Sequence, residues 1–127
     1  MKANELMIGD WVLDKKTNRP YKIIGTNDLL FHDDYSHIPL TAEILEKNGF
    51  KQGFIPALKT KSSLLLVANI GEDYIEVRFD RRNIAIWLDY DENGDGIYSD
   101  YLLPLPIYVH ELQHTLRLCG IDKEIEI

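Results

Sequence analysis

The sequence predicts an α+β fold with small antiparallel sheets or a partial barrel, a short middle helix, and a C-terminal helix packed on a β-meander. Three observations indicate this fold class. Short apolar stretches separated by turn residues fill the first third of the chain. Strict alternation of polar and apolar residues follows in "DYIEVRF". The segment "YVHELQHTLRL" instead repeats apolar residues at helical spacing.

The N-terminal third is expected to form three short strands. "WVL" follows a Gly-Asp turn, "YKIIGT" follows the polar turn "KKTNRP", and "LLFH" follows another turn at Asn27 and Asp28. The next segment, "IPLTAEILEKNGF", predicts a helix of about two turns. Thr41 suits its N-cap and Gly49 suits the position just past its end.

The second half is expected to form a β-meander and the final helix. "SLLLVAN", "DYIEVRF", "IAIWLDY" and "IYSDYLL" predict strands, with the hairpin "DRRN" and the loop "DENGDG" between them. Pro104 and Pro106 should stop the last strand, and Gly120 should end the helix. The length of 127 residues fits one domain, residues 1–127.

Composition narrows the classes of partner. The formal net charge is −7 and the basic residues are scattered, which disfavours nucleic acid. We expect neither a membrane span, which needs about 20 apolar residues, nor a secretory signal. The single cysteine, Cys119, rules out an internal disulfide and fits the reducing cytoplasm. It lies on the apolar helix face, so we expect a core thiol rather than a nucleophile. No cofactor is predicted.

One motif is typical of a specific kind of catalytic site. His110, Glu111 and His114 spell the zinc-hydrolase pattern H-E-x-x-H. Histidines four residues apart lie on one helical face and can bind one Zn²⁺, and the adjacent glutamate can act as general base on the bound water.

Two features of the sequence count against a zinc site. On a helical wheel at about 100° per residue, His110 and His114 fall roughly opposite the apolar stripe, which predicts a solvated polar face. Replacing either histidine should then change stability by only about 0.5 kcal/mol. A third ligand has no recognisable spacing, since Arg117 and Gly120 stand where the extended metzincin pattern needs glycine and histidine. The remaining candidates for a third ligand are His32, His37, Asp122, Glu124 and Glu126.

The acidic loop allows two interpretations. Asp91, Asn93 and Asp95 match positions 1, 3 and 5 of an EF-hand calcium loop, but Leu102 replaces the glutamate of position 12. Both flanks also read as strands rather than helices. A hairpin loop rich in turn residues is the simpler interpretation, and a weak calcium site is the alternative.

Three segments also carry a resemblance. "ELMIGDWV", "IPLTAEILEKNGF" and "IYVHELQHTLRLCGIDKEIEI" resemble a family of short uncharacterised proteins of Bacteroides and relatives, often encoded near phage-like or mobile-element genes. The family pattern has asparagine at the position of His114 and allows glutamine at that of Glu111. The resemblance implies a related fold and no mechanism, and it weakens the zinc interpretation.

The functional prediction therefore has two branches. The leading one is a non-enzymatic, cytoplasmic protein-interaction module with a protein partner. The alternative is a minimal zinc hydrolase that uses His110 and His114 as ligands and Glu111 as base.

Overall fold

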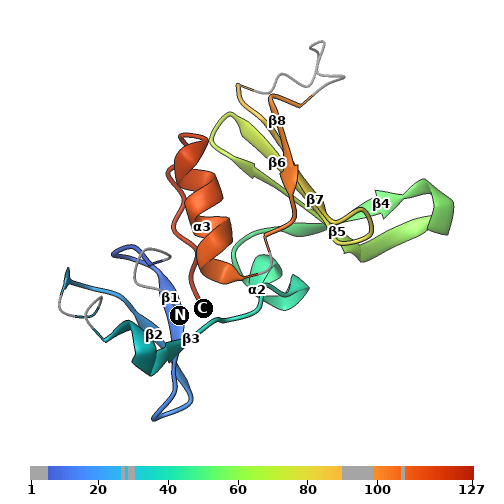
Figure 1. The fold of residues 1–127 in the computed structure, drawn as a ribbon. Helices are drawn as coiled ribbons and strands as arrows, with labels where there is room; N and C mark the ends of the chain where they lie inside the picture. Colours follow the sequence, from blue (N-terminus) through green and yellow to red (C-terminus); the bar gives the residue numbers. More distant parts are fainter. Residues whose placement is uncertain (1–5, 27, 29–30, 90–98, 107) are drawn as a thin grey trace. The chain divides into compact units, whose positions relative to one another are not determined.

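The structure is a computed structural model, and it confirms the predicted α+β class. The described strands form one three-stranded and one five-stranded antiparallel sheet, both open (Figure 1). A short helix, α2, lies in the middle of the chain, and the helix α3 lies near its end. The structure describes residues 6–26, 28, 31–89, 99–106 and 108–127.

The chain divides into two compact units. The first consists of Met1–Leu40 together with Ile107–Ile127, and the second of Thr41–Pro106. That the whole chain is a single domain stays a prediction.

The sheet of the first unit has the strand order β2-β1-β3. The prediction of a third strand at "LLFH" is wrong for Phe31 and His32, the two residues of this segment that the structure describes. Phe31 lies in a turn, where its carbonyl accepts a hydrogen bond of 2.8 Å from the Asp34 amide, and the strand forms further along. Consecutive aspartates favour such turns because their side chains compete for backbone groups. The elements are β1 (Trp11–Asp14), β2 (Arg19–Lys22), the 3₁₀ helix η2 (His32–Asp34) and β3 (Tyr35–Ser36).

Helix α3 (Val109–Leu118) belongs to this unit and packs against strand β1, whereas the sequence predicted packing on the β-meander. Its first amide is bound by a distant segment rather than by a capping side chain, since Val109 N–H donates to the Ile38 carbonyl at 2.9 Å. The predicted end at Gly120 is confirmed, with φ of +76°. Ile121 N–H donates back to the Leu116 carbonyl at 2.8 Å, which is the Schellman arrangement.

The second unit contains the predicted meander, with strand order β4-β5-β6-β7-β8. The alternation in "DYIEVRF" holds, because Ile75 and Val77 are fully buried and pair with Ile86 and Ile84 of the next strand. Strand β4 was not predicted from the sequence. The strands are β4 (Lys51–Ile55), β5 (Thr60–Ile70), β6 (Asp73–Arg78), β7 (Asn83–Trp87) and β8 (Tyr101–Pro104), and a 3₁₀ helix, η3 (Pro56–Leu58), joins the first two.

Helix α2 (Ala42–Lys47) contacts β4 and β5 of the same unit. Both of its predicted ends are confirmed. The Thr41 hydroxyl accepts a hydrogen bond from Ile44 N–H at 3.3 Å. Gly49 has φ of +90°, and Phe50 N–H donates to the Leu45 carbonyl at 3.0 Å while its ring is buried.

Candidate functional site

The polar face of helix α3 is covered at His110 and only partly exposed at His114 and Arg117. His110 is only 3% exposed, so its predicted solvent exposure is wrong. Besides the bond from Val109 to Ile38, Pro39 and Tyr108 form an isolated antiparallel bridge, which holds the segment before α2 beside the start of α3. A helical wheel of α3 takes no account of the segment around Ile38 and Pro39, because that segment comes from a distant part of the sequence.

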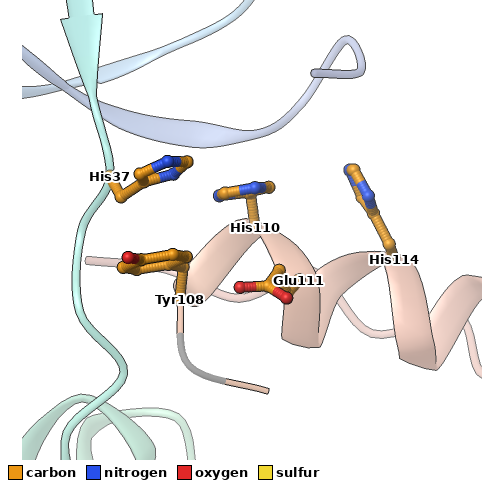
Figure 2. Close-up of a pocket in the computed structure, with 5 residues that line it drawn as sticks. All are labelled: His37, Tyr108, His110, Glu111 and His114. Atoms are coloured by element: carbon orange, nitrogen blue, oxygen red, sulfur yellow. The ribbon is translucent and has the colours of Figure 1, made fainter. Parts of the chain in front are cut away.

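A pocket of about 350 Å³ lies on this face, and all of its lining belongs to the first unit. Figure 2 shows the rings of His37, Tyr108 and His110 in nearly parallel planes. The His37 and Tyr108 rings stack with centroids 4.0 Å apart, and the His37 and His110 centroids are 5.2 Å apart. The lining residues are His37, Tyr108, His110, Glu111 and His114.

Burial controls the charge of His110. Loss of hydration lowers its pKa from the ordinary value, and the negative charge of Asp10 opposes this effect only in part. His110 is therefore neutral near pH 7. Its Nδ1 atom is buried without a hydrogen-bonding partner. A buried polar atom left in this way costs about 1–3 kcal/mol of folding free energy.

His114 is held by a residue at the other end of the chain. Its Nε2 atom lies 2.8 Å from Oδ2 of Asp10, whose side chain is fully buried. The same carboxylate accepts a hydrogen bond from Met7 N–H at 2.7 Å and pairs with Arg117 at 3.5 Å. Asp10 thus fastens the loop before β1 to helix α3. The sequence gives no sign of this role, because Gly9-Asp10 reads as an ordinary turn.

Gln113 is a second polar residue whose role was not predicted from the sequence. It is 3% exposed, and its amide clamps the C-terminal tail. Its Nε2 donates to the Lys123 carbonyl and its Oε1 accepts from Ile125 N–H, each at 2.8 Å. The only sequence signal for this role was a polar residue next to the apolar stripe.

The pocket brings together the three residues of the H-E-x-x-H pattern and one of the five candidate third ligands, His37. The tail candidates do not join them, since Glu124 and Glu126 pair with Lys22 at 3.2 and 3.7 Å and Asp122 is exposed. The side chain of His32 lies outside the described residues.

The arrangement as it stands does not fit a bound metal ion. Within the described part of the chain, no three His, Cys, Asp or Glu side chains are grouped closely enough to hold one. His114 also directs its Nε2 toward Asp10, so ligation through this atom requires breaking a partly buried hydrogen bond.

Two other sequence predictions have different outcomes. The proposed calcium ligands Asp91, Asn93 and Asp95 lie outside the described residues. Cys119 is buried, and this burial raises the pKa of its thiol, so its prediction as a core residue is confirmed.

Comparison with known proteins adds no further assignment. No family model, no curated protein and no solved structure matches the chain. Among the residues described, no helix has both the length and the apolar character needed to cross a membrane.

Proposed function

We propose that the chain is a non-enzymatic protein-interaction module, and that the pocket on helix α3 receives a side chain of its protein partner. One observation carries this proposal. The pocket is walled by the nearly buried, neutral His110 and by the stacked rings of His37 and Tyr108, with the carboxylate of Glu111 beside them. Such a surface gains both hydrogen bonds and apolar contact when a partner fills it.

General physical arguments favour this kind of site for a protein partner. Interface energy concentrates in a few anchor side chains that fill pockets, and aromatic residues are enriched at these positions. The net charge of −7 favours a protein partner over nucleic acid, whose phosphates need clustered Lys and Arg. The compartment we propose is the cytoplasm, in line with a chain whose single cysteine is free.

Peptide display followed by affinity measurement tests the proposal. Random peptides are selected on the immobilised chain, and binders are titrated against the parent, Tyr108→Ala and the control Tyr101→Ala. The control makes the same chemical change on strand β8, at a ring that is 40% exposed. We expect Tyr108→Ala to weaken binding roughly tenfold, as loss of one anchor contact does, and the control to have little effect.

The readout must separate binding from folding. Thermal melts establish that both variants are folded, and the amide signals of residues 109–114 show whether the peptide occupies the pocket. Selection that returns no binder, or binders that leave these signals and the Tyr108→Ala affinity unchanged, would contradict the proposal.

A minimal zinc hydrolase is the second candidate function. The observation in its favour is that His110, Glu111 and His114 share one pocket with a third histidine, His37. Two observations count against it. His114 is hydrogen-bonded to Asp10, and no three His, Cys, Asp or Glu side chains of the described residues are close enough together to hold a metal ion.

Metal analysis of protein purified without a polyhistidine tag decides between the two candidates. About one zinc per chain, lost in His114→Ala and accompanied by a lower melting temperature after chelation, would favour the hydrolase. Metal well below one equivalent, with a melting temperature that chelation does not change, would exclude it.

A further inference from the structure

We propose that the partner side chain that fills the pocket is an arginine. This inference rests on the proposed function and specifies the chemistry of the same site. It is carried by the juxtaposition of the Glu111 carboxylate, the imidazole of His110 and the stacked rings of Tyr108 and His37 in one pocket.

The pocket offers a negative charge to a cation. The carboxylate of Glu111 lines the pocket, and no described Lys or Arg side chain forms an ion pair with it. Arg117, which is on the same helix, directs its guanidinium to Asp10 instead, at 3.5 Å. A cationic side chain from a partner would supply the positive charge that pairs with the Glu111 carboxylate.

The neutral His110 favours, among cations, one that carries several hydrogen-bond donors. An uncharged imidazole does not repel a cation, and one of its two nitrogens accepts a hydrogen bond. A guanidinium has five N–H donors and no acceptor, so it can bond to the carboxylate and to an imidazole nitrogen together.

The aromatic rings favour arginine over lysine. A planar guanidinium stacks on aromatic rings and is more weakly hydrated than an ammonium group. The rings of Tyr108 and His37 both line the pocket; because they already cover one face of each other at 4.0 Å, we place the guanidinium on an outer face of this pair. The volume of about 350 Å³ is at the small end for ligand pockets, which suits a single side chain. The net charge of −7 also steers a basic segment toward the chain.

Three capped peptides test the inference on the full chain: acetyl-Gly-Arg-Gly-amide and its lysine and citrulline counterparts. Citrulline keeps the shape of arginine but carries no charge. Binding is followed through the amide signals of residues 109–114, up to about 10 mM peptide, since one anchor side chain alone binds weakly. We expect the arginine peptide to shift these signals, and the citrulline peptide to bind at least about tenfold more weakly.

A matched pair of charge variants assigns the effect to the pocket. Glu111→Gln should weaken the arginine peptide about tenfold, whereas Glu43→Gln, the same change at an exposed position on α2, should leave it within about twofold. Equal binding of citrulline, tighter binding of lysine, no response to arginine, or equal effects of the two variants would overturn the inference.

These results are distinguishable from failure of the proposed function. If displayed peptides occupy the pocket without needing an arginine, the interaction module stands and the arginine inference falls. If no displayed peptide occupies the pocket, the proposed function falls as well.

Discussion

Replacing His114 by alanine should destabilise the first unit, because it breaks a hydrogen bond to a buried charge. The Nε2 atom of His114 lies 2.8 Å from the carboxylate of Asp10, whose side chain is fully buried. Without the imidazole, the partners of that carboxylate among the described residues are the Met7 amide at 2.7 Å and the Arg117 guanidinium at 3.5 Å. A solvated helix face, as the sequence predicts, would show almost no effect.

The size of the effect follows from the exposure of the two partners. A hydrogen bond to a charged group contributes about 1.5–3 kcal/mol net. The His114 side chain is 23% exposed, so water can enter the vacated space and restore part of the loss. We therefore expect a loss of about 1.5 kcal/mol, near the lower limit of that range. Glu43→Ala, at an exposed position, should change stability by about 0.5 kcal/mol or less.

A double-mutant cycle in urea isolates the pair. The parent, His114→Ala, Asp10→Asn and the double variant are unfolded at one fixed pH, and the midpoint and slope are compared. Asp10→Asn keeps the shape of the side chain and removes its charge. We expect a coupling of about 1 kcal/mol or more between the two substitutions. Additive effects within about 0.5 kcal/mol would refute the argument that Asp10 and His114 act as a pair.

Three further predictions follow from buried or crowded side chains. Because burial lowers the pKa of His110 in the folded chain, only the unfolded chain takes up its proton just below the ordinary value of about 6.5. Unfolding curves from pH 7.5 to 5 should therefore show the parent losing more stability than His110→Gln, and parallel pH profiles would contradict this. Gln113→Leu removes two hydrogen bonds of 2.8 Å and should cost about 2–3 kcal/mol. Hydrogen exchange at the Ile125 amide should then quicken, and unchanged protection would count against the clamp. In Gly53→Ala the new Cβ would lie 2.7 Å from Cδ2 of the buried Leu65, so the variant should lose about 1–3 kcal/mol. A melting temperature equal to that of the parent would show that the β4-β5 pair relaxes freely.

Elements whose signals are local in the sequence could be predicted. Thr41 and Gly49 mark the ends of α2 because capping and positive φ depend on the neighbouring residues alone. Alternation likewise predicts β6, since its side chains point to opposite faces in turn. Strand β4 escaped prediction because Lys51–Ile55 has little alternation and depends on pairing with β5, including an irregularity in register at Gln52 and Gly53.

The surroundings of α3 could not be predicted from the helix itself. The wheel separates an apolar stripe from a polar face correctly as far as Leu112 and Leu116, which are fully buried. It fails for His110, because burial there depends on contacts from residues 37–39. It also gives no sign of Asp10, which meets His114 across 104 positions of sequence. A periodic pattern describes one element, whereas these contacts depend on how distant segments return to it.

The same contacts separate the roles of the three residues in the H-E-x-x-H pattern. In a zinc site, both histidines and the glutamate serve one ion, so removing any of them should affect metal binding and stability together. In this chain His114 is tied to Asp10, while Glu111 lines the pocket without a described cation beside it. The structure therefore favours separable effects: His114→Ala should act mainly on the stability of the first unit, and Glu111→Gln mainly on binding in the pocket. If the two substitutions instead lower stability equally, and chelation of the parent reproduces the loss, the pattern acts as a metal site and the interaction proposal loses its main support.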